Sequence, residues 1–379
     1  MNSKILLILL SSWFMGSCTY LGSYSKNFKS AKKEKLEKRS EKFHVRWAKN
    51  LDPSQQTGNL PIALNSPLVY KGVLFAGDGE GHMSAYEVGN GRLVWKSNDN
   101  NYYHQKPIIH EDHVIYGTVE GRVYARHYLT GKLKFEVDLD TSVESAGVVA
   151  NGRLYFHLRN HKLFALDAET GKILWAYRRS VPFLTTVQKV SKPLIIGNRL
   201  YVGFADGSVA CFAVEDGNLL WEQKLSRGLK FVDVDASPIL YKDKLVIGSM
   251  AGKVSFLEPS SGSVIRNLPY SIARSAVAAD DGLYFVTIEG EILRYNHDGK
   301  EELKKVLSSK SLGDFKVEKD KVYVGTLEGR FLELDRNTFK IKRELELGHD
   351  QSAIFGELSL SDEIVAFISS RYRLYVIEK

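Results

Sequence analysis

Three histidines that lie close together in the sequence are the first residues whose types could support metal chemistry. His104, His110 and His113 include a His-x-x-His spacing, which recurs among zinc ligands. The pair His110 and His113 falls, however, where other segments of the chain have short polar sequences such as YKGV and VANG. Short polar segments between apolar runs are typical of surface turns. We therefore expect a turn here and predict no metal site.

A glycine-rich run, Gly77–Gly81 (GDGEG), could cradle a phosphate group or a calcium ion. A phosphate loop needs a helix directly after it, a calcium loop needs an Asp-x-Asp-x-Asp ladder of ligands, and the sequence has neither. The run aligns with GTVEG and GFADG further along the chain, which favours a repeated turn. The sequence also lacks the Gly-x-Ser-x-Gly and zinc-protease motifs. We predict no catalytic residue and no cofactor, and a protein that is not an enzyme.

These turns belong to a repeat whose clearest copy is Phe164–Trp175, with the sequence FALDAETGKILW. It combines a short strand, a polar turn that closes on Gly171, and a second strand that ends in Trp175. Equivalent positions recur at intervals of 40, 40, 46, 45, 38, 39 and 43 residues. They are Gly81, Gly121, His161, Gly207, Gly252, Gly290, Gly329 and Tyr372. Short strands with this period predict an all-β fold, an eight-bladed β-propeller of four-stranded antiparallel blades.

The two ends of the repeat region are expected to share a blade. The last copy, Gly356–Lys379, supplies only three strands, and His44–Leu51 (HVRWAKNL) resembles an isolated fourth strand. Pairing of this N-terminal strand with the C-terminal blade closes the ring and removes open sheet edges. The propeller should therefore span residues 43–379. Four tryptophans fall on expected fourth strands and are interpreted as packing between blades: Trp47, Trp95, Trp175 and Trp221.

The N-terminal residues predict export and lipid attachment. The apolar run Ile5–Met15 is too short to cross a bilayer and fits the centre of a signal peptide over residues 1–17. Small residues precede Cys18 and resemble a lipobox, in which the cysteine thiol receives diacylglycerol. Thr19 stands where an Asp would signal retention in the inner membrane, so this resemblance implies the outer membrane. The alternative is an ordinary secretory signal with an incidental cysteine.

Positive charge is concentrated beside that cysteine. The chain has a net charge of +7, and Lys26–Lys42 alone has eight basic and three acidic residues. The remaining chain is close to neutral, so nucleic acid is not expected as a partner. We interpret residues 18–42 as the lipidated cysteine and a flexible basic tether beside an anionic lipid surface. The second cysteine, Cys211, lies in an apolar strand and is expected to be buried without a disulfide partner.

Two segments interrupt the repeat on either side of the fourth blade. They are Arg178–Val190 (RRSVPFLTTVQKV) and Ser226–Val234 (SRGLKFVDV), and they account for the two longest intervals. Because they flank one blade, both should project near each other on one face of the ring. Each mixes apolar, basic and acidic residues, as a loop that contacts another protein does. We expect the partner-binding surface here, with ordinary variation in loop length as the alternative.

The repeat, the lipobox and the tether together resemble the BamB family, the propeller lipoproteins of the outer-membrane β-barrel assembly machinery. The strongest local similarity is Val232–Pro238 (VDVDASP), which resembles an Asp-Val-Asp segment before blade five in that family. The resemblance implies that this acidic pair and the loop before blade four contact periplasmic domains of the barrel-inserting subunit, BamA. It assigns these partner-binding residues: Leu184, Thr186, Val187, Lys230, Asp233 and Asp235. A Leu-x-Leu-Arg pattern of the family is not kept in Leu184–Gln188.

Sequence and resemblance together predict a non-enzymatic scaffold, lipid-anchored on the periplasmic face of the outer membrane. It is expected to bind the BamA-like subunit and to aid folding and insertion of outer-membrane proteins, with unfolded precursors as a second class of partner. One alternative is a quinone-dependent dehydrogenase-like enzyme, because FALDAETGKILW is similar to the repeat of pyrroloquinoline-quinone enzymes. In those enzymes the motif locks blades together and separate residues bind quinone and calcium; their frequent vicinal disulfide cannot form from Cys211 alone. The other alternative is a lipoprotein that binds envelope polysaccharide or another envelope protein.

Overall fold

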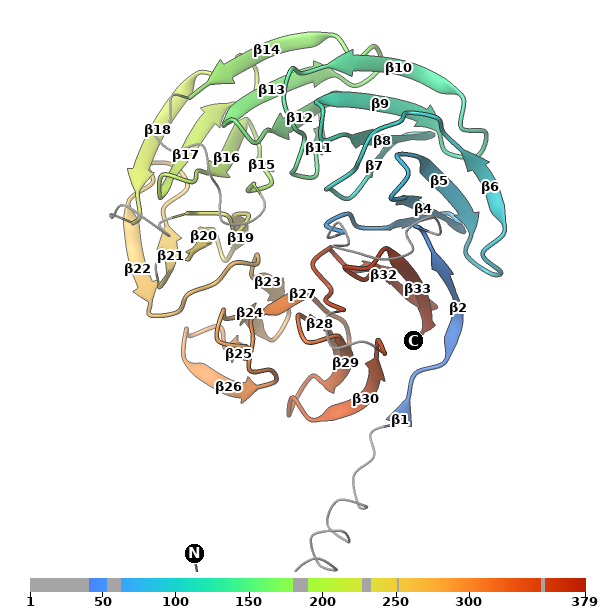
Figure 1. The fold of residues 1–379 in the computed structure, drawn as a ribbon. Helices are drawn as coiled ribbons and strands as arrows, with labels where there is room; N and C mark the ends of the chain where they lie inside the picture. The colour runs from blue at the N-terminus through green and yellow to red at the C-terminus, as the bar shows by residue number, and fades with distance from the viewer. Residues whose placement is uncertain (1–40, 53–62, 180–189, 227–232, 251, 349–351) are drawn as a thin grey trace, which may run out of the picture. The chain divides into compact units, whose positions relative to one another are not determined.

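The computed structural model describes residues 41–52, 63–179, 190–226, 233–250, 252–348 and 352–379. The chain divides into two units, residues 1–41 and residues 42–379. In the second unit the strands form eight sheets arranged around a central axis (Figure 1). The predicted eight-bladed β-propeller is therefore confirmed. Within the described part of the chain, no helix has the length and apolar character needed to cross a membrane.

The strands are short, and apart from β1 (Glu41–Lys42) they are grouped here by blade, each blade in the order of its sheet. Blades one to four contain β3 (Leu68–Tyr70), β4 (Val73–Gly77), β5 (Met83–Glu87) and β6 (Leu93–Lys96); β7 (Ile108–His110), β8 (His113–Gly117), β9 (Arg122–His127) and β10 (Leu133–Asp138); β11 (Val148–Ala150), β12 (Arg153–His157), β13 (Lys162–Asp167) and β14 (Ile173–Arg178); β15 (Leu194–Ile196), β16 (Arg199–Gly203), β17 (Ser208–Ala213) and β18 (Leu219–Lys224). Blades five to eight contain β19 (Ile239–Tyr241), β20 (Lys244–Ser249), β21 (Lys253–Leu257) and β22 (Val264–Leu268); β23 (Val277–Ala279), β24 (Gly282–Val286), β25 (Glu291–Tyr295) and β26 (Glu301–Val306); β27 (Leu312–Val317), β28 (Lys321–Thr326), β29 (Arg330–Asp335) and β30 (Ile341–Glu346); β31 (Ser359–Leu360), β32 (Ile364–Ile368), β33 (Arg373–Glu378) and β2 (Val45–Asn50).

Each blade is an antiparallel sheet that runs from an inner strand near the axis to an outer strand at the rim (Figure 1). Blade eight takes its outer strand from the start of the repeat region. There β2 pairs with β33, with Val45 opposite Ile377 and Asn50 opposite Arg373. The N-terminal strand closes the ring as predicted, and it satisfies a sheet edge that would otherwise stay open.

The middle strands of each blade form most of the core. β4 and β32 are buried at every position, because both faces of a middle strand are covered by neighbouring blades. The outer strands β14 and β18 have only exposed or half-buried side chains. Burial therefore falls from the middle of a blade towards its rim.

Tryptophans on the outer strands lock one blade to the next. Trp175 on β14 donates its indole Nε1 hydrogen to the carbonyl oxygen of Val214 in blade four, at 3.1 Å. The same bond recurs from three other indoles: Trp47 to Val88 at 2.8 Å, Trp95 to Tyr128 at 2.9 Å and Trp221 to Pro259 at 3.0 Å. The prediction that these indoles pack between blades is confirmed.

The turns between the second and third strands share one backbone conformation. φ is positive, between 53° and 99°, at all eight positions that the repeat made equivalent: Gly81, Gly121, His161, Gly207, Gly252, Gly290, Gly329 and Tyr372. Glycine adopts this left-handed region without steric cost, whereas His161 and Tyr372 are held there by the fold. The equivalence predicted from spacing is thus also an equivalence of backbone geometry.

Candidate functional site

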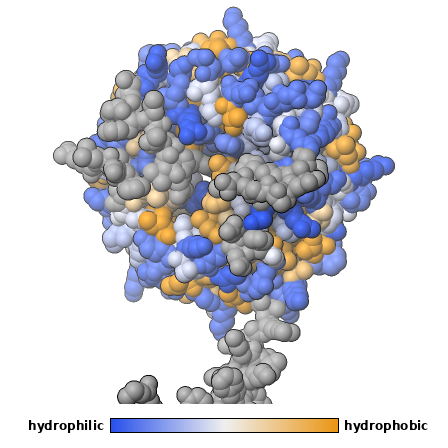
Figure 2. Space-filling model, viewed as in Figure 1, coloured by the Kyte–Doolittle hydropathy of each residue, from blue (hydrophilic) through white to orange (hydrophobic). Residues whose placement is uncertain are grey.

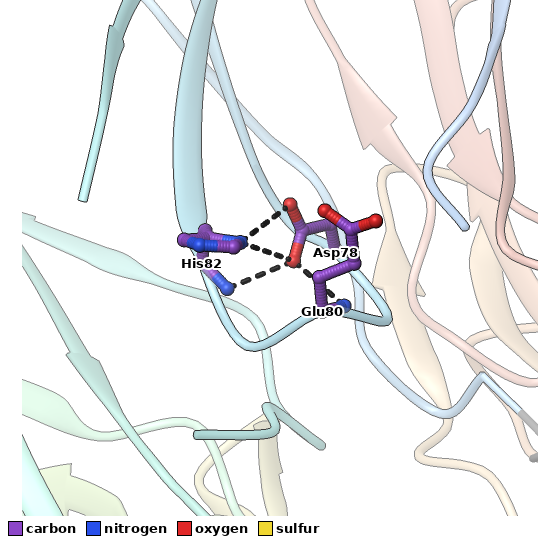
Figure 3. Close-up of side chains that lie close together, drawn as sticks. All are labelled: Asp78, Glu80 and His82. Carbon is purple, nitrogen blue, oxygen red and sulfur yellow. Dashed lines mark hydrogen bonds and ion pairs between the residues drawn. The ribbon is translucent and has the colours of Figure 1, made fainter. Parts of the chain in front are cut away.

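The turn between β4 and β5 brings Asp78, Glu80 and His82 together, with candidate ligand atoms within 4.8 Å of one another (Figure 3). The Asp78 carboxylate accepts hydrogen bonds from the backbone N–H groups of Glu80 and His82, at 3.0 and 2.8 Å. It also lies 3.2 Å from His82 Nδ1. The ammonium group of Lys96 is 3.2 Å from Asp78 and 3.5 Å from Glu80, so it already supplies the positive charge that a metal ion would bring. The cluster ties a blade turn together, as expected for the GDGEG run.

The histidines of the possible zinc motif have separate partners. His110 and His113 flank the turn between β7 and β8, as predicted. His110 lies 3.8 Å from Glu169, which also pairs with Lys134. His104 lies 3.7 Å from Glu144. Among the described residues, no candidate metal cluster joins the three histidines.

Cys211 lies on β17 opposite Trp221 and is completely buried, as predicted. Burial raises the pKa of its thiol to about 11, so the sulfur stays protonated at neutral pH. A protonated, enclosed thiol is a poor nucleophile and a poor metal ligand. Cys211 therefore acts as an apolar packing residue between blades four and five, where it belongs to the core cluster that includes Val234 and Leu245.

The loop before blade four is fixed at its first end by Arg179. The guanidinium group lies 2.5 Å from Asp206 and 2.7 Å from Glu222, and it covers the ring of Phe204 at 4.6 Å. Burial opposes the charge, but the hydrogen bonds that Glu222 and Asp206 accept raise the pKa of Arg179 above its ordinary value. A largely buried guanidinium with two carboxylate partners is costly to displace, so this end of the loop is held firmly.

The second end of the same loop is held at the buried Ser191. The Ser191 carbonyl oxygen accepts a hydrogen bond from His157 Nδ1 at 2.9 Å, and its hydroxyl accepts one from the Gly203 N–H at 3.3 Å. Burial lowers the pKa of His157 to about 3, so the imidazole is neutral. Its Nε2 is buried and has no hydrogen-bond partner in the described part of the chain.

The loop before blade five reaches the same place in blade four. The Val234 N–H donates to the carbonyl oxygen of Phe204 at 3.2 Å, and the Asp233 carbonyl accepts from the Met250 N–H at 3.1 Å. Because Arg179 covers the ring of Phe204, the described stems of both loops meet at this residue. The stems thus leave the ring side by side, on the blade that the two interruptions flank.

Two of the predicted partner-binding residues lie within the described residues. Asp233 and Asp235 are only 3% and 8% exposed, and Asp235 faces a central cavity. Their side chains are therefore built into the base of the second loop rather than displayed on the surface. The other predicted residues lie outside the described residues, as does Cys18 with the predicted signal peptide and most of the tether: Leu184, Thr186, Val187 and Lys230.

Sequence reasoning missed Arg179 and Phe204, which connect the two loops. Arg179 is the second residue of the interrupting segment Arg178–Val190, so its position at the base of a loop was visible. Its partners could not be predicted, because they come from separate parts of the next blade. Asp206 lies in the turn between β16 and β17, and Glu222 lies on β18. The only sequence feature that indicated a residue fixing the loop stem was the arginine at the start of the long insertion.

A cavity of about 310 Å³ lies on the axis, where the inner strands of blades two to eight begin. Its charged lining consists of four cations and four carboxylates: Lys106, Lys192, Arg274, Lys316, Glu144, Asp235, Asp314 and Glu357. Two of the carboxylates have clear cationic partners, since Lys316 lies 3.0 Å from Asp314 and Arg159 lies 2.8 Å from Glu144. The centre of the ring is therefore polar and charged, in contrast to the apolar faces between blades.

Comparison with known proteins identifies one family over most of the propeller. The model of the family described as outer membrane protein assembly factor BamB matches residues 44–142, 103–231 and 130–278. The assembly factor BamB of Shewanella oneidensis is 24% identical over 319 residues, which cover 79% of this chain and 80% of that protein. The crystal structure of BamB from Moraxella catarrhalis has a TM-score of 0.72 at 17% identity, and the match covers 86% of this chain and 99% of that one.

Sequence similarity to an enzyme covers a smaller part of the chain. A quinoprotein ethanol dehydrogenase of Pseudomonas aeruginosa is 28% identical over 156 residues, which cover 40% of this chain and 24% of the enzyme. The shared part is of the length of a few blades. In structure, a europium-containing methanol dehydrogenase matches with a TM-score of 0.71 at 12% identity, over 89% of this chain and 93% of that one, which shows a shared fold alone.

Proposed function

The chain belongs to the family of outer membrane protein assembly factor BamB, and from this membership we propose a non-enzymatic scaffold that aids folding and insertion of outer-membrane proteins. The protein is attached through Cys18 to the outer membrane and faces the periplasm. Its principal partner is a BamA-like barrel-inserting subunit, which it binds through the periplasmic domains of that subunit. A rigid ring suits this role, because it holds several loops at fixed positions.

The convergence of two loop stems on Phe204 is the observation that carries this proposal. Arg179 fixes one stem against the Phe204 ring, and Val234 fixes the other through the Phe204 carbonyl oxygen. Because the two described stems meet at one residue, the points from which the two loops depart have a defined spacing. A rigid support of this kind lowers the entropy lost when a partner binds.

The two groups of assigned residues have different roles in this proposal. Leu184, Thr186, Val187 and Lys230 supply the surface that the partner touches. Asp233 and Asp235 are buried, so they act from beneath, by fixing the end of the second loop and contributing negative charge to its base. Removal of their charge should therefore weaken binding of the partner more than it lowers the stability of the ring.

Affinity capture of the full-length lipoprotein in gentle detergent tests the function. We expect recovery of a large outer-membrane β-barrel protein with periplasmic domains. Recovery of glycan or of unrelated envelope proteins, without such a barrel protein, would contradict the scaffold function and favour the alternative of another envelope-binding lipoprotein.

The residue assignment is tested with the double variant Asp233→Asn/Asp235→Asn in the same capture. The amide side chains keep the size of the carboxylates, and Asp78→Asn is the matched control, because Asp78 is also buried but lies in the turn of blade one. Weaker capture by the double variant with an unchanged melting temperature supports the assignment. Equal capture by the double variant and the control refutes these two residues while leaving the function intact.

Unfolded outer-membrane proteins are proposed as a second class of partner, bound along the rim. The outer strands other than β30 end their sheets, and several carry exposed apolar side chains, from 38% exposed at Val94 to 63% at Val306. Figure 2 shows hydrophobic residues interleaved with hydrophilic ones around the edge of the molecule. An extended chain can add to such an edge through backbone hydrogen bonds. A photo-crosslinking side chain at Leu220 should capture an unfolded barrel precursor, whereas one at the exposed Lys340 on a turn should not.

The similarity to a quinoprotein dehydrogenase calls for one direct comparison. Equilibrium titration of the protein with pyrroloquinoline quinone and calcium should show no saturable binding if the protein is a scaffold. Saturable binding with dye-linked alcohol oxidation would replace the scaffold by an enzyme.

A further inference from the structure

We propose that the central cavity binds a small polyanion, with carboxylate or phosphate oxygens, through Arg274, Lys106 and Lys192. The site lies among blades two, four and six, at the start of their inner strands. It does not depend on the partner surface proposed above. The inference begins from three cations for which the described residues supply no ion pair.

Arg274 is the central residue of this argument. It faces the cavity, its Nε is buried without a hydrogen bond, and the structure records no hydrogen bond or ion pair for it among the described residues. Burial lowers the pKa of Arg274 although Asp314, Glu357 and Asp235 act in the opposite direction. An enclosed guanidinium with no bonded partner is costly, and an anion that enters the cavity removes that cost.

Lys106 and Lys192 add two ammonium groups to the same cavity. Each residue is followed by a proline and then by the first residue of an inner strand, so the two have equivalent places in their blades. The Lys106 ammonium group donates to the Leu358 carbonyl oxygen at 3.2 Å, and no acidic group of the described chain lies within ion-pair distance of it. Burial lowers the pKa of Lys106. Both lysines therefore also favour a negatively charged ligand.

The carboxylates that line the cavity have interactions of their own, and Asp314, Glu357 and Asp235 also act on Arg274 at a distance. Asp314 binds Lys316 and accepts a hydrogen bond from the Leu358 N–H at 2.8 Å. Glu144 binds Arg159, at 2.8 Å. Asp235 and Glu357 have interactions of their own as well. The acidic groups thus have partners, while Arg274, Lys106 and Lys192 have no ion-pair partner within the described residues.

The geometry selects a compact ligand with at least two anionic groups. A guanidinium group presents a planar fork that matches two oxygens of a carboxylate or phosphate. The two ammonium groups can bind a second anionic group as point charges. The cavity, at about 310 Å³, is at the lower end of the range for small-molecule sites, which excludes long chains.

Isothermal titration at constant ionic strength tests the site with three probes: citrate for carboxylates, pyrophosphate for phosphates, and chloride as a monovalent control. We expect saturable binding of one equivalent of citrate or pyrophosphate, and a rise in melting temperature that chloride does not cause. Preference for citrate assigns the site to carboxylates, and preference for pyrophosphate assigns it to phosphates. Absence of saturable binding by both overturns the proposal.

Arg274→Gln and Lys192→Gln locate the binding, with the exposed Lys340→Gln as the matched control. Each cavity variant should weaken binding by about 10- to 100-fold, as expected for loss of a charged hydrogen bond. Without an anion, Arg274→Gln should melt at the same temperature as the wild type or higher, because a buried charge without a hydrogen-bonded partner has been removed. A purely structural arginine would give the opposite result, a lower melting temperature. Equal affinity in Arg274→Gln and Lys340→Gln would also overturn the proposal.

Discussion

The indole ring of Trp175 lies directly against the α-carbon of Gly217 in the next blade, where an added β-carbon would stand 2.6 Å from the ring. The same contact joins Trp47 with Gly91, Trp95 with Gly131 and Trp221 with Gly262. Gly217 is required by its backbone as well, since its φ is +73°. The contact that locks neighbouring blades therefore needs both an indole on one blade and a glycine opposite it on the next.

Gly217→Ala should lower the free energy of unfolding by about 2–4 kcal/mol, the sum of backbone strain and overpacking against Trp175. Gly152→Ala is the matched control, because Gly152 has a similar φ of +71° but no atom within 4 Å of an added β-carbon. The control should lose only about 1 kcal/mol from strain. Equal losses in urea unfolding of the two variants would show that the indole contact contributes little.

His157 should make the protein less stable as the pH falls. Burial lowers the pKa of His157 to about 3, while in the unfolded chain the histidine titrates near its ordinary pKa of 6.5. Below pH 6.5 the unfolded state therefore binds a proton that the folded state does not, and stability is lost until the pH approaches 3. Between pH 7 and pH 5 this residue should cost about 2 kcal/mol.

His157→Phe should remove that part of the pH dependence, and the exposed His297→Phe serves as the control. Denaturant unfolding at pH 7 and pH 5 measures the difference. If His157→Phe loses as much stability as the wild type over this interval, other groups are responsible.

Arg179 should matter more to stability than an arginine on the rim. Arg179→Met leaves Asp206 and Glu222 without their shared cation, and we expect a loss of about 2 kcal/mol with weaker capture of the barrel-inserting partner. Arg122→Met is the comparison, because Arg122 also pairs with a glutamate, Glu136, but its side chain is 48% exposed. That exposed pair should contribute little. Equal effects on stability and capture would show that the loop stem needs no anchor.

Cys18 remains the predicted site of lipid attachment. Metabolic labelling with a radioactive fatty acid should mark the wild-type protein and should fail with Cys18→Ala. The variant should still fold, because the described ring makes its contacts within residues 42–379. A label that persists in Cys18→Ala would refute the lipobox.

The sequence predicted the architecture because the propeller repeats one local pattern. Turn positions could be aligned even at His161 and Tyr372, where a glycine is replaced, since the apolar runs on each side kept their spacing. The repeat was less informative where the residue that packs against the glycine of the next blade is not a tryptophan. Arg266, for example, lies against Gly299 in the place where other blades have a tryptophan, and a lone arginine on an outer strand gives no sign of this.

The site was less accessible to sequence reasoning because it is assembled across blades. The family resemblance assigned Asp233 and Asp235 to contacts with a partner, yet Asp233, Val234 and Asp235 are all buried as the chain turns into the centre of the ring. Lys106 and Arg274 precede the inner strands of blades two and six, half of the ring apart, and share one cavity only because the blades form a circle. Neither result follows from a local sequence pattern, since each depends on which residues at the beginning of the inner strands face the axis of the ring.

The pairing of β2 with β33 also imposes an order in time. Arg46 and Glu378 are 332 positions apart and form an ion pair at 3.2 Å, so this blade needs both the earliest and the latest strands to be synthesised. Blades one to seven can be built from earlier parts of the chain, but the ring stays open until β33 is present. A chain truncated before that strand would expose β2 as an unpaired edge, a target for proteases and for aggregation. Closure of the ring thus requires every strand of the propeller to have been synthesised.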